Sequence, residues 1–359
     1  MADNEEYVTA EPSCNLSFLG GETVYVVKIK AVGDGENFAD SDWSEFGFNE
    51  IFKYTLLADG SGYEVNLSVS SVELQERKVV VPSTYGNLPV TRIADKMFYK
   101  CASLTEVVLP NTLKEIGANA FYNCDALESI ELPESVTAIG TGAFRECVAL
   151  KKIVVPSGVE CIAEEMFYEC ASLTEIVLSN TLKEIKRAAF AHCIALESIE
   201  LPESVTAIGS SAFSGCLSLK KIVVPDGIER IEGNMFGDCT SLTEVVLPST
   251  LKEIRGMAFL GCIVLENIEL PESVTAIGSI AFGGCSSLKK IVVPTGVERI
   301  EGSTFVGCSN LTEVVLPSTL KEIMGMAFRN CEALKTVVLP SSLKDIGKGA
   351  FSSCPLESV

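Results

Sequence analysis

Histidine, positive charge and long apolar runs are all scarce in this chain. Its 359 residues include one histidine, His192. Ser/His/Asp triads, Cys/His pairs and multi-histidine metal sites all require histidine, so most chemistry of these kinds is excluded. No run approaches the roughly 18 apolar residues of a membrane-spanning helix, and the N-terminus has neither a basic nor an apolar targeting segment. We therefore expect that this chain does not insert directly into a membrane, and its sequence shows no signal peptide.

The shortage of basic residues limits the partners that this chain can bind. It has 28 Lys and Arg against 48 Asp and Glu, a net charge of -20, and residues 1–50 carry 11 acidic residues and 2 lysines. Such a surface repels phosphate backbones and anionic lipid headgroups. We expect no nucleic-acid partner, and proteins, glycans or cations remain open.

A strict internal repeat is the strongest feature that is present. Phenylalanine recurs with a constant 23-residue spacing from Phe98 to Phe351, and cysteine follows three residues later each time, from Cys101 to Cys354. The twelve copies share the consensus LxxIxLPxxVxxIxxxAFxxC. One structural unit per copy, stacked so that equivalent side chains form ladders, is the expected outcome.

Each unit contains two extended segments and a turn. Residues 104–109 form the first segment of one unit, which Pro110 ends, and equivalent prolines follow in later units except at Ser179. Residues 136–139 form a second segment, and Gly140 leads from it into the Ala-Phe turn. We therefore predict an α/β solenoid of twelve 23-residue coils, with short parallel strands about 4.8 Å apart and a short helical or 3-10 corner.

A longer 69-residue period is superimposed on the first. LTEVVLP or LTEIVLS begins at Leu104, Leu173, Leu242 and Leu311, and LKKIVVP begins at Leu150, Leu219 and Leu288. The duplicated unit is therefore three coils long.

The unit LPxSVTxIGxxAFxxCxxLxxI resembles the BspA-like, or Treponema pallidum-type, leucine-rich repeat over residues 82–359. This resemblance implies a bacterial surface protein whose solenoid binds other proteins, including host extracellular-matrix proteins in some members. It also implies an extracellular or cell-surface location, although this chain shows neither a signal peptide nor an anchor.

The N-terminal part divides into two predicted segments before the solenoid of residues 97–359. Residues 1–47 form an acidic segment, of which residues 24–45 are similar to the last two strands of a fibronectin type III domain; a hairpin belonging to the cap is the alternative. If the similarity holds, the chain is a fragment of a larger extracellular protein. Residues 48–96 hold a β-hairpin around Asp59-Gly60, which we predict to be the N-terminal cap and the entry to the first coil.

The cysteines and carboxylates do not predict an active site. Twelve of the 14 cysteines occupy one repeated position and no CxxC pair occurs, so we expect free thiols packed beside phenylalanine and no metal or cofactor. Cys161 is expected to face solvent because later copies have Arg230 and Arg299 in its place. Carboxylates recur opposite lysines, as Glu128 does opposite Lys151, which is typical of charge ladders. We predict that the chain is not an enzyme.

The outward positions of the first strand are the candidate protein-binding face. Valines on an exposed strand make a mixed apolar and charged stripe that can capture a protein, although ordinary β-propensity is the alternative explanation. The residues of this face are Val108, Glu131, Val154, Val177, Glu200, Val223, Val246, Glu269, Val292 and Val315.

These observations favour a non-catalytic adhesion or protein-recognition module. A structural spacer or stalk is one alternative, because near-identical units suit length expansion. A cell-wall glycan-binding module is another, and it would use Tyr99, Tyr122 and Tyr168. We expect a monomer or weak end-to-end association through the last coil; a monomeric mass at high concentration in light scattering would contradict such association.

Overall fold

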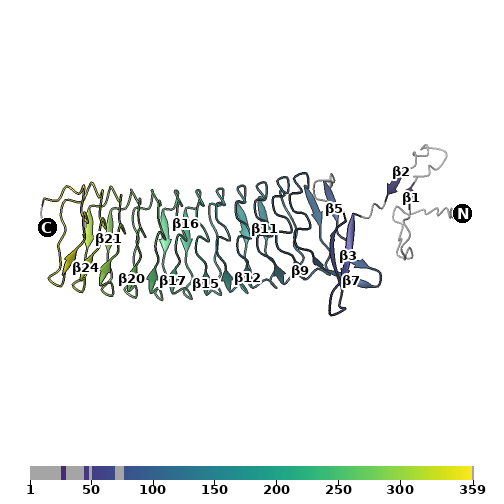
Figure 1. Cartoon of the computed structure of the whole chain (residues 1–359), viewed down its shortest axis with the longest axis horizontal. Coiled ribbons are helices and arrows are strands. Elements are labelled where there is room, and N and C mark those ends of the chain that lie inside the picture. Colours follow the sequence, from purple (N-terminus) through teal and green to yellow (C-terminus); the bar gives the residue numbers. More distant parts are fainter. Residues whose placement is uncertain (1–25, 30–43, 48–50, 69–76, 358–359) are drawn as a thin grey trace.

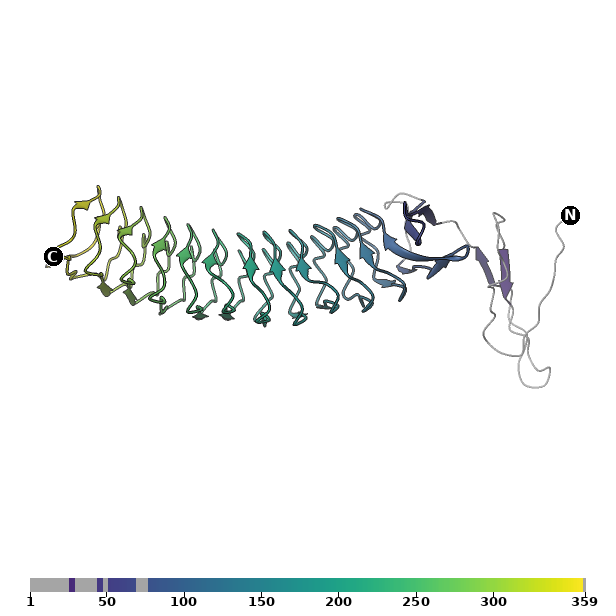
Figure 2. The same cartoon turned by 90° about the horizontal axis from the view of Figure 1, so that it is seen from below.

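Stacked coils make up most of this protein, whose computed structural model describes residues 26–29, 44–47, 51–68 and 77–357. From residue 77 onward the chain winds into a long, gently curved solenoid (Figures 1 and 2). We number its coils 1 to 12 by their repeated phenylalanine, here called the ladder phenylalanine, from Phe98 to Phe351. The predicted solenoid of 23-residue coils is confirmed.

Short parallel strands form two edges of the coils. Those of the first edge are β5 (Lys78–Val80), β8 (Glu106–Val108), β11 (Lys152–Val154), β13 (Glu175–Val177), β16 (Lys221–Val223), β18 (Glu244–Val246), β21 (Lys290–Val292) and β23 (Glu313–Val315). Those of the second edge are β7 (Leu88–Ile93), β9 (Glu115–Ile116), β10 (Ala138–Ile139), β12 (Cys161–Ile162), β14 (Glu184–Ile185), β15 (Ala207–Ile208), β17 (Arg230–Ile231), β19 (Glu253–Ile254), β20 (Ala276–Ile277), β22 (Arg299–Ile300), β24 (Glu322–Ile323) and β25 (Asp345–Ile346).

Both sheets are interrupted once in every 69-residue unit. The first edge pairs strands in twos, such as β11 with β13, and the second edge pairs them in threes, such as β12 with β14 and β15. No strand pairing joins β13 to residues 198–200, or β15 to β17, in the part of the chain that the structure describes. Neither sheet therefore runs the length of the solenoid.

The corner that carries the ladder phenylalanine is continuous instead. The amides of Lys96, Phe98 and Lys100 donate hydrogen bonds of 2.7–2.8 Å to carbonyl groups of the next coil. Equivalent bonds from the phenylalanine and from the residues two before and two after it join every successive pair of the twelve corners. This amide ladder is the one backbone connection that repeats at every step.

The prediction of a helical or 3-10 corner is wrong, and the described residues contain no helix. Two residues per corner, such as Lys96 and Lys100, have φ near +60°. Because Lys96 is left-handed, the turn closed by the hydrogen bond from Met97 N to Ala94 O cannot continue into a helix. Alternate amides are thereby free to bond to the next coil, and the fold is a β-solenoid.

The ladder phenylalanines fill the core behind this corner. All from Phe98 to Phe328 are fully buried, and adjacent rings stack with centroids 5.1–5.7 Å apart. Burying one such side chain contributes roughly 1.5–3 kcal/mol of transfer free energy. A coil can realise this contribution only between two neighbours.

Each ladder cysteine also bonds to the preceding coil. From Cys124 to Cys354, the thiol donates to the carbonyl oxygen of the ladder phenylalanine one coil earlier, at 3.0–3.3 Å. The ladder cysteines from Cys124 to Cys354 are free thiols, as predicted. The sequence did not reveal that they also act as hydrogen-bond donors.

A β-hairpin precedes the first coil. Strands β3 (Phe52–Leu56) and β4 (Tyr63–Leu67) pair antiparallel, β4 pairs parallel with β7, and the two-residue strand β6 (Thr84–Tyr85) also joins β7. The hairpin therefore extends the second sheet beyond coil 1. Its turn uses Gly60, whose φ of 69° suits glycine.

Strands β1 (Val26–Ile29) and β2 (Ser44–Gly47) pair antiparallel near the N-terminus. The fibronectin-like similarity of residues 24–45 stays a prediction, because most of that stretch lies outside the described residues. The proposed domain boundaries at 47 and 96 also stay predictions.

We predict that Phe213→Ala lowers the free energy of unfolding by about 3–5 kcal/mol, because it opens a cavity inside the phenylalanine stack. The exposed Val223→Ala is the matched control and should change stability by about 0.5 kcal/mol or less. Urea denaturation followed by circular dichroism measures both. Equal effects of the two substitutions would contradict the central place of the stack.

The buried thiols predict a loss of stability at alkaline pH. Burial raises the pKa of Cys101 to about 11 and that of Cys285 to about 12, because a thiolate is poorly solvated there. The folded state thus holds these protons more tightly than the unfolded state. The resulting stabilisation is complete below about pH 9 and is lost as the pH rises towards 12.

Cys285→Ala tests this linkage. The variant should be less stable than the unsubstituted chain at pH 7, and the difference should shrink as the pH rises from 9 to 11. Urea midpoints measured across this range give the difference directly. A gap that stays constant with pH would show that Cys285 titrates equally in the folded and unfolded states.

Candidate functional site

The predicted binding face lies along the first edge of the coils, and its ten side chains are exposed. Its seven valines have exposed fractions of 41–45 %. Strand pairing sets Val154 beside Val177 and Val223 beside Val246. The face is therefore a row of valine pairs, and we call it the valine face. Its role in binding stays a prediction.

Ion pairs flank the valine pairs. Lys152 Nζ lies 2.6 Å from Glu175 Oε1, and Lys151 Nζ lies 2.7 Å from Glu128 Oε2. The same two pairs recur in the later 69-residue units, so the predicted charge ladders are confirmed. Each exposed pair contributes about 0–1 kcal/mol.

Three carboxylates of the valine face have no such partner. No ion pair within the described ranges includes Glu131, Glu200 or Glu269. They occupy the coils in which the first sheet has no full strand. The valine face therefore carries unneutralised negative charge at every third coil.

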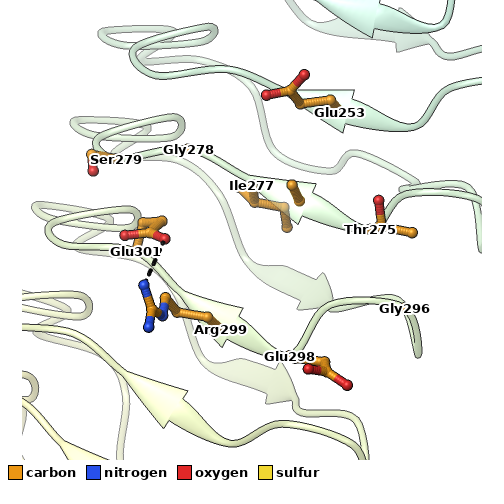
Figure 3. Close-up of a pocket in the computed structure, with 10 residues that line it drawn as sticks. Glu253, Thr275, Ile277, Gly278, Ser279, Gly296, Glu298, Arg299 and Glu301 are labelled. Carbon is orange, nitrogen blue, oxygen red and sulfur yellow. Dashed lines mark ion pairs between the residues drawn. The ribbon is translucent and has the colours of Figure 1, made fainter.

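A cleft of about 510 Å³ lies where the second sheet is interrupted between β20 and β22 (Figure 3). Its carboxylates are engaged by basic side chains: Arg299 pairs with Glu301 and Glu322, and Arg255 pairs with Glu253. The amides of Glu298 and Glu301 have no backbone acceptor in the described structure. The hydroxyl groups of Thr275 and Ser279 also line the cleft, and that of Thr275 donates to the Lys252 carbonyl.

The tyrosines considered for glycan binding pack against their neighbours. Tyr99 stacks on Tyr122 with ring centroids 4.7 Å apart, and the guanidinium of Arg145 lies 4.5 Å from the ring centroid of Tyr168. Arg145 also lies 5.8 Å from the ring of Tyr122. Ring faces that are covered in this way are poor platforms for a sugar.

A hydrogen bond also engages one of these hydroxyl groups. Tyr122 donates to Glu146 Oε2 at 2.8 Å, which raises the pKa of Tyr122 to about 12 because ionisation would break the bond. This phenol therefore stays protonated near neutral pH.

His192 and Cys161 lie apart from any catalytic constellation. The ring of His192 packs edge-on against Tyr168 with centroids 5.4 Å apart, and the residue is exposed. The half-buried thiol of Cys161 lies 3.6 Å from Glu184 Oε2. Burial raises the pKa of this thiol, so it is less reactive than a free cysteine.

Metal and membrane sites are likewise absent from the part of the chain that the structure describes. No group of three or more potential protein ligands gathers there to hold a metal ion. Nor does that part contain a helix long and apolar enough to cross a membrane.

The coil geometry has relatives among solved structures. A leucine-rich repeat protein from Bacteroides ovatus is 28 % identical, with a TM-score of 0.53, covering 84 % of this chain and 91 % of that one. A leucine rich cell surface protein from Faecalibacterium prausnitzii is 27 % identical, with a TM-score of 0.49, covering 85 % and 97 %. The leucine rich repeat protein of T. pallidum is 29 % identical, with a TM-score of 0.43, covering 67 % and 89 %. No curated protein matches the chain.

The repeat itself matches a described family. Residues 91–220, 160–264 and 229–357 match the BspA type leucine rich repeat region, in six copies. These overlapping matches cover the solenoid and most of the chain. They describe a repeat and indicate no enzymatic family. The protein belongs to the BspA-type leucine-rich repeat family.

Proposed function

We propose that this chain is a non-catalytic recognition or adhesion module of a bacterial cell-surface or secreted protein, and that it binds protein ligands through the valine face. The observation that carries this proposal is the row of exposed valine pairs. Repeated apolar pairs on a rigid edge offer a partner several equal contacts. Multiple weak contacts on one rod then add up to useful avidity.

The charges on and beside the valine face limit the kinds of protein that can bind it. The lysines that flank the valine face are paired with glutamates, whereas Glu131, Glu200 and Glu269 on the face have no basic partner among the described residues. A partner with apolar side chains and interspersed basic residues complements this arrangement. Extracellular-matrix proteins are the first candidates, because the family resemblance implies them.

A structural spacer is the second candidate function. Its support is the uniformity of the valine face, where Val223, Val246 and their neighbours are unchanged in the next 69-residue copy. Glycan binding has less support, because the tyrosine rings cover one another.

A binding screen distinguishes these functions. We predict that the chain binds one or more immobilised extracellular-matrix proteins, and that changing Val177, Val223 and Val246 to Glu weakens binding at least tenfold. The added carboxylates would replace apolar contacts with charged groups that lose hydration on docking, so the loss should persist at high salt. Surface plasmon resonance measures both forms.

The matched control places the same three charges elsewhere. Val148, Ile194 and Leu217 are 39–42 % exposed, close to the valines, but lie outside the valine face. Changing them to Glu should leave binding unchanged. Equal loss in both variants would remove the valine face as the site. No binding by any form would favour the spacer, and binding confined to a glycan array would favour the glycan module.

A further inference from the structure

Sequence differences between the 69-residue copies concentrate on one part of the coil. We define the corner as the ten residues from four before each ladder phenylalanine to five after it. The copies at 182–250 and 251–319 differ at 18 positions, and 15 of these lie in the corners. The two sheet edges and their prolines are nearly identical. The corner is therefore where the chain has diversified its own repeat.

Solvent exposure alone does not explain this concentration. Val223 and its copy Val292 are exposed on the valine face, yet they are identical, as are Lys221 and Lys290. The corner thus varies between these copies, both at exposed positions such as Asp238 and at buried ones such as Met235, whereas the valine face does not. A surface that differs from copy to copy can recognise a feature that is not itself repeated.

Backbone conformation shows that two of these differences, at Met257 and Ile280, oppose local stability, as does Met326, the unchanged copy of Met257. Met257, Ile280 and Met326 have φ of 61°, 62° and 60°. Left-handed backbone strains a bulky residue and strains a β-branched one most. The equivalent positions of other coils hold residues that tolerate this conformation, among them Asn119, Gly142, Asn234 and Gly349. Large apolar side chains here have no conformational advantage for the framework.

Apolar side chains lie along this corner on coils 8 to 11, with Ser303 in the left-handed position of coil 10. Leu260, Ile280 and Val306 are partly buried there. Ile280 Cγ2 and Leu260 Cδ1 lie 2.6 Å and 3.3 Å from where a Cβ of Gly283 would stand, so both side chains lie over that glycine. Met257 and Met326 are 43 % and 44 % exposed. We call this surface the corner strip, and its residues are Met257, Leu260, Ile280, Val306 and Met326.

Opposite charges bracket the corner strip. Asp238 precedes it on coil 7 and Arg329 follows it on coil 11, and both are exposed. No ion pair in the described structure includes either residue, and Arg329 Nη1 lies 3.8 Å from Met326 Sδ. Four coil steps separate the two charges, which is about 19 Å at the spacing of parallel strands.

We propose that the corner strip binds an amphipathic helix of a partner protein, with the acidic N-terminal end of that helix at Arg329 and its basic C-terminal end at Asp238. A length of about 19 Å corresponds to roughly 13 helical residues. Acidic residues in the first turn and basic residues in the last turn also suit the helix dipole, so the partner's stability and its docking favour the same charge order. This site is independent of the valine face.

A designed peptide probes the corner strip directly. Its length is about 16 residues, which at the rise of an α-helix slightly exceeds the distance between the two charges. Leu occupies one helical face, Glu the first turn and Lys the last, and both ends are blocked. A second peptide keeps the composition and the leucines but exchanges the Glu and Lys positions. Fluorescence anisotropy against the full chain should give an affinity at least fivefold higher for the first peptide.

Substitution to asparagine distinguishes a loss of peptide binding from a loss of folding stability. Met257→Asn, Ile280→Asn and Met326→Asn together introduce the residue that the chain itself uses at Asn119 and Asn234. The triple variant should bind the first peptide at least tenfold more weakly, while its Tm rises by a few degrees because backbone strain is relieved. Asp238→Lys with Arg329→Glu should reverse the preference between the two peptides.

The outcomes are distinct from those for the valine face. Changing Val177, Val223 and Val246 to Glu should leave peptide affinity unchanged. Absence of binding by the unsubstituted chain, equal affinity of the triple variant, or an unchanged preference after the charge exchange would each overturn the proposal. Matrix-protein binding through the valine face would be unaffected by any of these results.

Discussion

The amide ladder of the corner is the interaction on which the rest of this solenoid depends. At every step from coil 1 to coil 12, three backbone amides bond to the next coil, and the thiol of each new cysteine bonds back to a phenylalanine carbonyl. Both sheets are interrupted in every 69-residue unit, at different steps. The corner spans each interruption, so the stack stays continuous where one edge has no pairing. The Phe and Cys positions are therefore identical in all twelve coils.

Outward-facing positions of the same corner are under no such constraint. The backbone bonds fix where these residues stand, and the buried phenylalanines fix the spacing, but side chains that point to solvent can change freely. The outward side chains of the corner differ along the solenoid. The early coils carry a packed group made of Tyr99, Tyr122, Arg145 and Tyr168, whereas coils 8 to 11 carry the corner strip. The valine face, in contrast, repeats the same chemistry along its length. A single rod thus presents one uniform surface and one that varies with position.

The periodic spacing of the repeat made most of the fold predictable from the sequence. The conformation of the corner and the interruptions of the two sheets were not predictable, because both depend on local backbone geometry. The 23-residue spacing of Phe98 and its successors was enough to predict the coils, their buried core and the free thiols, and the Glu128–Lys151 spacing predicted the lateral ion pairs. The corner was predicted as helical because Lys96, Glu165 and Met257 do not suggest a left-handed conformation, which is usually marked by glycine or asparagine. The sheet interruptions were equally hidden, because LESIELP and LTEVVLP have the same apolar spacing.

The candidate site was predictable only where it follows the strand pattern. Alternation identified the outward valines correctly, whereas the corner strip becomes visible only once the turn conformation is known and the internal copies are compared.

Hydrogen–deuterium exchange resolved by residue tests the amide ladder most directly. The amides of the ladder phenylalanines and of the residues two before and two after them should be protected in coils 1 to 11, whose corners bond to a following coil. Sheet amides such as those of Glu229 and Glu232, which have no backbone acceptor, should exchange fast, and this loss of protection should recur once in each 69-residue unit. Corner amides that exchange faster than the sheets, or sheets protected evenly from end to end, would contradict the account.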